Sequence, residues 1–168
     1  MSPEPTDAEL VEACKRGSAS AFETLYRRHR DWVVSLAYRY CGNRDDALDV
    51  LQETFHYLLR KLPDLELRAK LTTFLFPAVK HRALDRRRAA TRMATLPAEE
   101  PVGAHGLPDD IRDIWATLGP PHREVLELRF VEGFALDEIA DILHLPLGTV
   151  KSRLHYALAA LREKIGER

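Results

Sequence analysis

The chain has 168 residues, of which 45% are hydrophobic and 30% charged, a composition typical of a globular protein. Its formal net charge is −1, which excludes a polycation, so any nucleic-acid binding must come from local clusters of charge. The two cysteines exclude a disulfide framework, the polar N-terminus carries no secretion signal, and no apolar run is long enough to span a membrane. We therefore expect a cytoplasmic protein without membrane insertion.

Apolar residues recur at helical spacing along almost the whole chain, and no convincing alternating strand is found, which predicts an all-α fold. A first helix is expected at Asp7–Lys15, ended by Gly17. A second helix is expected to begin with a capping box of Ser20 and Glu23 and to continue to Tyr40, with or without a break.

Gly42 and Asn43 are expected to separate the second helix from a third, which has an apolar stripe and an acidic face. The stripe consists of Leu48, Leu51, Phe55, Leu58 and Leu62. The acidic face consists of Asp46, Asp49, Gln52 and Glu53. Taken alone, this face is typical of a solvated surface with acids near a helix N-terminus.

After a polar loop, a further helix contains Pro77, which is expected to kink it or delay its start. This segment carries a basic run, "KHRALDRRRAATR", whose local field suits phosphate groups. Its cations are Lys80, Arg82, Arg86, Arg87, Arg88 and Arg92. Most of the nearby aromatic residues are expected in the core, and one or two near the loop are able to stack on an unpaired base.

Residues 93–108 have the Pro- and Gly-rich composition of a linker. Helical spacing resumes at residues 111–118, 123–130, 136–143 and 146–165. The sequence therefore predicts two small helical domains, residues 1–92 and 109–168, joined by that linker.

The stretch "FALDEIADILHLPLGTVKSRLHYAL" has the pattern of a helix-turn-helix. Ile139 and Leu143 face inward from its first helix, Leu145 fills the turn, and Val150 and Leu154 face inward from its second helix. An ordinary pair of antiparallel helices remains the alternative. The residues of the second helix favour DNA binding, because its first turn presents polar side chains opposite Val150.

Each polar side chain of this turn suits one kind of DNA contact. Lys151 is expected to donate to guanine acceptors or to a phosphate, and Ser152 and His155 are expected to read base edges. Thr149 is expected to bind a phosphate, and Arg153 to contact the backbone.

Two long segments resemble a known family. "AFETLYRRHRDWVVSLAYRYCGNRDDALDVLQETF" resembles region 2, and "LGPPHREVLELRFVEGFALDEIADILHLPLGTVKSRL" region 4, of sigma-70 family factors of the extracytoplasmic-function (ECF) group. The resemblance implies a subunit that binds core RNA polymerase and directs promoter recognition, DNA melting and transcription initiation. It implies no catalysis, cofactor, metal or small-molecule substrate. Its expected partners are core polymerase, promoter DNA and an anti-sigma protein, whose expected target is an apolar surface that includes Leu158 and Leu161.

The resemblance also assigns residues. The acidic face matches the surface that binds the clamp-helix coiled coil of the polymerase, and the loop 63–71 with the following helix matches the part that melts the minus-ten element and holds a flipped base. The minus-ten set consists of Phe74, Lys80, His81, Arg82, Arg86, Arg87 and Arg88. The set for the minus-thirty-five element consists of Thr149, Lys151, Ser152, Arg153, His155 and Tyr156. Phe74, His81 and His144 depart from the usual tryptophan, asparagine and glycine, and the position of His144 is one where a positive φ is expected.

Two other functions remain open from the sequence. A helix-turn-helix regulator would act as a dimer on palindromic half-sites without replacing a sigma subunit. An enzyme would need convergent acids, histidines or cysteines in a pocket, and the seven histidines of this chain are scattered.

Overall fold

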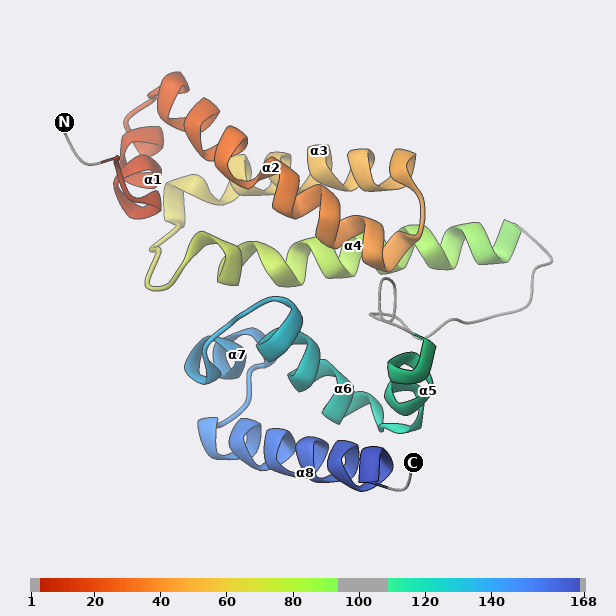
Figure 1. The fold of residues 1–168 in the computed structure, drawn as a ribbon. Coiled ribbons are helices and arrows are strands. Elements are labelled where there is room, and N and C mark those ends of the chain that lie inside the picture. The colour runs from red at the N-terminus through yellow and green to blue at the C-terminus, as the bar shows by residue number, and fades with distance from the viewer. Residues whose placement is uncertain (1–3, 94–108, 167–168) are drawn as a thin grey trace. The chain divides into compact units, whose positions relative to one another are not determined.

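The computed structural model describes residues 4–93 and 109–166, and every regular element within these ranges is helical (Figure 1). This confirms the predicted all-α fold. The chain divides into unit 1, Met1–Ala98, and unit 2, Glu99–Arg168. The expected linker, apart from Met93, lies outside the described residues. None of the described helices is both long enough and apolar enough to cross a bilayer.

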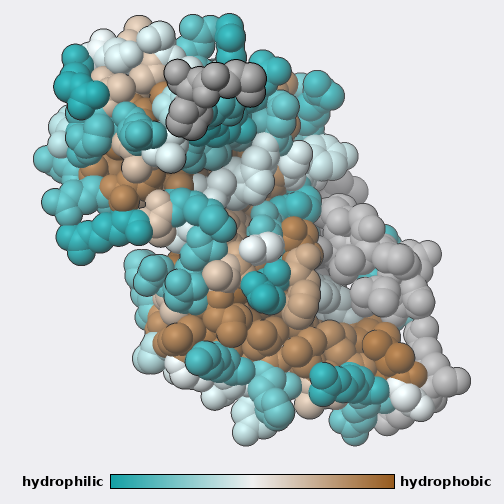
Figure 2. Space-filling model, turned by 60° about the vertical axis from the view of Figure 1, so that its left-hand side comes forward, coloured by the Kyte–Doolittle hydropathy of each residue, from teal (hydrophilic) through white to brown (hydrophobic). Residues whose placement is uncertain are grey.

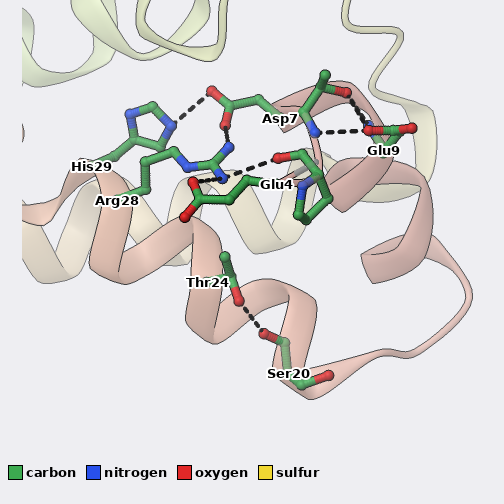
Figure 3. Close-up of polar contacts among 9 residues, drawn as sticks. Glu4, Asp7, Glu9, Ser20, Thr24, Arg28 and His29 are labelled. Atoms are coloured by element: carbon green, nitrogen blue, oxygen red, sulfur yellow. Dashed lines mark hydrogen bonds and ion pairs between the residues drawn. The ribbon is translucent and has the colours of Figure 1, made fainter. Parts of the chain in front are cut away.

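Helix α1 (Asp7–Lys15) has the predicted bounds and is held at both of its ends. At its start, the amide of Thr6 donates to Glu9 Oε2 (2.7 Å) and the amide of Glu9 donates to Thr6 Oγ1 (3.3 Å), which forms a capping box. Gly17 follows its end with a φ of 88°. Figure 3 shows the carboxylate of Asp7 placed between Arg28 and His29, so that α1 is attached to the next helix.

Helix α2 (Ala19–Cys41) is continuous over 23 residues, and its cap differs from the prediction. Ser18 is the N-cap, with its hydroxyl accepting from the amide of Ala21 (3.2 Å), whereas Ser20 lies inside the first turn. The capping box expected from Ser20 and Glu23 is therefore wrong. The positive φ of the preceding glycine turns the chain early enough for Ser18 to take the extended cap conformation, and Glu23 pairs with Arg27 on the surface instead.

Helix α3 (Arg44–Lys61) begins as predicted, with Gly42 in the left-handed conformation at the end of α2 and Asn43 as N-cap. The expected apolar stripe is wrong at one position, because Leu48 is 40% exposed. Helix α3 packs against both α2 and α4, so its buried face extends round to Ala47, Val50 and Thr54. Leu48 is left at the edge of that face, next to the acidic residues.

A short 3₁₀ turn, η1 (Leu62–Asp64), leads into the loop before α4 (Leu71–Met93). Helix α4 begins six residues before Pro77, so Pro77 does not delay its start, which was one of the two effects expected of it. Pro77 is exposed and removes one backbone donor. In Figure 1, α2, α3 and α4 lie side by side, with α1 packed on α2, and these contacts enclose the core of unit 1.

Unit 2 contains α5 (Asp109–Thr117), α6 (Pro120–Leu126), the π-helical turn η2 (Glu127–Val131), α7 (Leu136–Leu143) and α8 (Leu147–Gly166). Helix α6 starts on two prolines that follow Gly119, where missing amide donors cost nothing. Helix α8 packs against both α6 and α7. The core that joins it to α5 and α6 consists of Trp115, Leu118, Leu126 and Ala157.

Candidate functional site

The helix-turn-helix consists of α7, a turn of three residues, and α8 (Figure 1). Ile139 and Val150 are fully buried where the two helices face each other, and the small side chain of Ala140 is also buried. His144, the first residue of the turn, has φ 53° and ψ 44°, which confirms the positive φ expected there. The amide of Leu145 then donates to the carbonyl oxygen of Ala140 (3.0 Å), which closes the end of α7.

The first turns of α8 present the predicted DNA-reading side chains to solvent. Lys151, Ser152, His155 and Tyr156 are exposed, and the His155 and Tyr156 rings lie edge to face with centroids 5.6 Å apart. The hydroxyl of Ser152 donates to the carbonyl oxygen of Gly148 (3.0 Å). Exposed side chains of this kind on the second helix of such a motif suit a major groove.

Two other members of the predicted set lie deeper. Thr149 and Arg153 are half-buried at the margin of this surface. Partial burial suits residues that contact the DNA backbone beside a helix rather than base edges beneath it.

A second surface of interest is the acidic face of α3, defined as Asp46, Asp49, Gln52 and Glu53. Asp49 and Gln52 are exposed, and the Asp49 side chain is 53% accessible, whereas Asp46 and Glu53 are half-buried. Leu48 is exposed on the same side of the helix as Gln52. Acids beside an exposed apolar side chain suit a protein partner that brings both cations and apolar contacts.

The acidic face is joined to α4 by two arginines. Arg86 donates from Nη1 to Asp49 Oδ2 (2.7 Å) and from Nη2 to Glu53 Oε1, and its Nη1 lies 3.7 Å from Asp46 Oδ1. Arg82 Nε lies 3.8 Å from Glu53 Oε2. The hydrogen bond to Glu53 is the main reason that the pKa of Arg86 is raised above its ordinary value.

An aromatic and cationic cluster lies next to these ion pairs. The rings of Tyr57 and Phe74 are stacked, with centroids 5.7 Å apart and planes 11° from parallel. The guanidinium of Arg82 lies 4.9 Å from the Tyr57 centroid, and Lys61 Nζ lies 5.8 Å from it on α3. Phe74 and Arg82 were both in the minus-ten set, whereas Tyr57 and Lys61 were not assigned to it. Tyr57 lies four residues after Glu53, a spacing that places both side chains on one side of α3. This spacing is the sequence signal from which Tyr57 could have been assigned to the site.

The remaining cations of the minus-ten set do not form one continuous row. Lys80 Nζ lies 5.6 Å from the ring centroid of Tyr40, and His81 Nε2 lies 3.2 Å from Asp85 Oδ2. Arg88 Nη1 is 3.3 Å from the other oxygen of Asp85, and Arg87 is half-buried. His81 and Arg88 therefore meet at Asp85, whereas Lys80 lies beside a ring of α2.

A surface hollow of about 570 Å³ lies beside the loop that precedes α4. The loop contributes Leu67, Ala69 and Lys70, α2 contributes Arg28, and the N-terminal segment contributes residues 4–8. Its lining combines apolar residues with two cations, Arg28 and Lys70, and two acids, Glu4 and Asp7, and its volume is sufficient for a nucleobase. In the described parts of the chain, no three histidines, cysteines or acids are grouped as metal ligands.

Comparison with known proteins identifies the family. The family description "Sigma-70 region 2" matches residues 25–93, and "Sigma-70, region 4" matches residues 116–163. The chain is 32% identical to the ECF RNA polymerase sigma factor SigE of Mycolicibacterium smegmatis, over 99% of this chain and 70% of that protein. It is 28% identical to the ECF RNA polymerase sigma factor SigW of Bacillus subtilis, over 92% and 94% of the two chains.

Solved structures agree in fold. A structure of CnrH in complex with the cytosolic domain of CnrY matches with a TM-score of 0.68 and 24% identity, over 96% of this chain and 97% of that one. The sigma factor RpoE from Bartonella quintana, in complex with the anti-sigma factor NepR, matches with a TM-score of 0.59 and 22% identity, over 86% and 96%. Together with the sequence matches, the helix-turn-helix of unit 2 and the helical bundle of unit 1 place the chain in the sigma-70 family, as an ECF RNA polymerase sigma factor.

Proposed function

We propose that the two units divide the work of this sigma factor. Residues 1–92 would bind core RNA polymerase and the minus-ten element, residues 109–168 would bind the minus-thirty-five element, and residues 93–108 would connect them. The observation that carries this assignment is the separation of two surfaces of opposite character, an acidic face on α3 in unit 1 and the Lys151 turn on α8 in unit 2. Like its family, the protein acts as a transcription initiation factor.

The polymerase-binding site would be the acidic face of α3. Asp49 and Gln52 are exposed there, and Leu48 supplies an apolar contact beside them. A basic partner surface, which the family resemblance identifies as the clamp-helix coiled coil, would be steered toward these acids before apolar contacts form.

The minus-ten site would be built on α4 and the loop before it. Phe74 and Tyr57 would stack against an unpaired base while Arg82 faces the strand, and the hollow at Leu67 and Lys70 would receive a flipped base. The cations that contact phosphates from α4 would be Lys80, His81, Arg82, Arg87 and Arg88. Arg86, expected in the same set, would have to leave its ion pairs to join them.

The minus-thirty-five site would be the first turns of α8. Lys151, Ser152, His155 and Tyr156 would read base edges, and Thr149 and Arg153 would contact the backbone. Tyr156 stands where the family commonly has a basic residue, so one contact between a cation and a phosphate is missing. The affinity for duplex DNA is therefore expected to fall only gradually as the salt concentration rises.

An anti-sigma protein is proposed as a further partner. RpoE of Bartonella quintana was solved with an anti-sigma factor, and unit 2 of this chain offers an apolar surface. Figure 2 shows a band of hydrophobic side chains along one face of unit 2. Leu158 and Leu161 of α8 are half-buried and pack against the core of that unit. We place the protein in the cytoplasm, where its polymerase acts.

The test is run-off transcription with purified core polymerase, paired with measurement of polymerase affinity. Asp49→Arg is expected to abolish co-purification and transcription, because it reverses the charge at the centre of the acidic face. Asp31→Arg makes the same change at an exposed residue of α2 and should have little effect. Polymerase binding that survives Asp49→Arg would refute the acidic face as the binding site.

The α8 surface is tested separately. Lys151→Ala should weaken promoter binding by about 5- to 150-fold, because a good side-chain pair with a base contributes about 1–3 kcal/mol of discrimination. Lys164→Ala on the same helix is the control. A dimer that binds palindromic duplex without polymerase would restore the alternative of an independent regulator.

A further inference from the structure

Arg86 connects the two surfaces of unit 1 that the family resemblance assigns to different partners. It lies on α4, within the basic run, but its guanidinium reaches α3 and donates to both Asp49 and Glu53. Its Nη1 is also close to Asp46, at 3.7 Å. Three of the four residues of the acidic face therefore meet one cation.

These contacts decide which groups Arg86 is able to serve. Both terminal nitrogens already donate to carboxylates, so the forked pair of donors that would bind a phosphate is committed to α3. The side chain is only 33% exposed, whereas Arg88 on the same helix is more exposed and pairs within its own helix. Arg86 is thus the member of the minus-ten set that is oriented away from a DNA role.

The same contacts organise the acidic face. Asp49 and Glu53 are four residues apart on one helix, and like charges at this spacing repel each other. The guanidinium between them offsets that repulsion and fixes one oxygen of each carboxylate. The second oxygen of Asp49 stays available on a side chain that is about half exposed. Because exposed ion pairs contribute little to folding stability, the main effect of Arg86 is on the orientation of these acids.

We propose that Arg86 is a positioning residue of the polymerase-binding face: it holds the Asp49 and Glu53 carboxylates together so that both are oriented for the cations of a single polymerase element. This inference rests on the proposed function of the acidic face. It moves Arg86 from the DNA-binding set to the polymerase-binding site, and it leaves Lys80, His81, Arg82, Arg87 and Arg88 as the phosphate-binding cations of α4.

The first experiment measures the affinity of the full-length protein for core polymerase. Arg86→Gln is expected to raise the dissociation constant about 5-fold, because binding must then order the two carboxylates that Arg86 holds in the native chain, and this cost exceeds the gain from losing a competing cation. Arg86→Lys should recover part of the loss. Arg27→Gln, which breaks an exposed ion pair within α2, is the matched control and should leave the affinity unchanged. An unchanged or tighter affinity for Arg86→Gln would overturn the inference.

The second experiment distinguishes positioning from direct contact. In a Glu53→Gln background, Arg86→Gln should cost clearly less polymerase affinity than in the native chain, because Arg86 acts through that carboxylate. Additive losses would mean that Arg86 contacts the polymerase itself. At polymerase concentrations that saturate the Arg86→Gln variant, promoter opening should return to the native level, and a persistent defect would assign Arg86 to DNA.

The Asp49→Arg variant shows whether the acidic face itself or only the role of Arg86 is wrong. If Asp49→Arg retains polymerase binding, the acidic face is not the binding site and the proposed function fails there. If Asp49→Arg loses binding while Arg86→Gln keeps it, the face stands and only the role of Arg86 is wrong.

Discussion

Replacing Asp7 by alanine is expected to detach α1 from the rest of unit 1. Asp7 Oδ1 accepts a hydrogen bond from Arg28 Nη1 (2.6 Å), and Oδ2 lies 2.8 Å from Nε2 of the buried His29 (Figure 3). A further bond, from Arg28 Nη2 to the carbonyl oxygen of Pro5 (3.0 Å), belongs to the same cluster. The carboxylate therefore joins the first turn of α1 to two successive residues of α2.

The size of the effect follows from burial. Leaving the buried His29 nitrogen without its partner costs about 1–3 kcal/mol. The lost bond from Arg28 adds at most about 1 kcal/mol, because Arg28 is 30% exposed and solvent replaces the carboxylate. We expect Asp7→Ala to lower the free energy of unfolding of unit 1 by about 2–3 kcal/mol, and Asp7→Asn by less.

Amide hydrogen exchange under native conditions is the suitable assay, because it reports the opening of α1 and α2 without interference from unit 2. Glu4→Ala is the matched control: Glu4 also faces Arg28, but at 3.9 Å and with 95% of its side chain exposed. That change should cost close to zero. If Asp7→Ala and Glu4→Ala lost equal protection from exchange, the conclusion that Asp7 stabilises unit 1 because its contacts are buried would be refuted.

Three further outcomes follow from the described geometry. Gly42→Ala should destabilise unit 1 by about 1–2 kcal/mol in urea denaturation, because the φ of Gly42 is 84°. Gly148→Ala is the control: an added Cβ would meet open space at both positions, but Gly148 has no positive φ, so this change should not destabilise unit 2. Phe55→Ala should cost about 3–5 kcal/mol in the same assay, since its buried ring packs edge to face against the half-buried rings of Phe22 and Tyr26; a loss below about 1 kcal/mol would contradict this. Burial raises the pKa of the Cys41 thiol, so its alkylation should require a higher pH in the folded chain than in urea. The stability that the neutral thiol contributes to the folded chain should be lost as the pH rises through that raised pKa. Coincident alkylation profiles in the folded and unfolded chain would contradict the last of these.

Local signals were sufficient for much of the fold. The bounds of α1 and the change of helix at Gly42 and Asn43 follow from residues close together in sequence, whereas the positive φ of His144 was expected from the glycine that is usual there in the family. The cap of α2 was missed by two residues, because the sequence offers several serines there and only the backbone at Gly17 selects Ser18.

Contacts between helices were harder to predict. The exposure of Leu48 depends on how far α2 and α4 wrap around α3, which periodicity along one helix does not specify. The ion pair of Arg86 with Asp49 joins residues that are 37 positions apart, so the acidic face and the basic run were read as independent surfaces. Tyr57 was missed as a partner of Phe74 for the same reason.

The bond between Ser152 and Gly148 would give the proposed recognition helix, α8, a chemical preference. A hydroxyl whose hydrogen is held by its own backbone has only lone pairs left to offer a base. It would then pair with the exocyclic amino groups of adenine or cytosine and disfavour the oxygen edges of guanine and thymine. Sequence selection among promoter variants should show that bias beneath Ser152, and replacement by alanine should erase it.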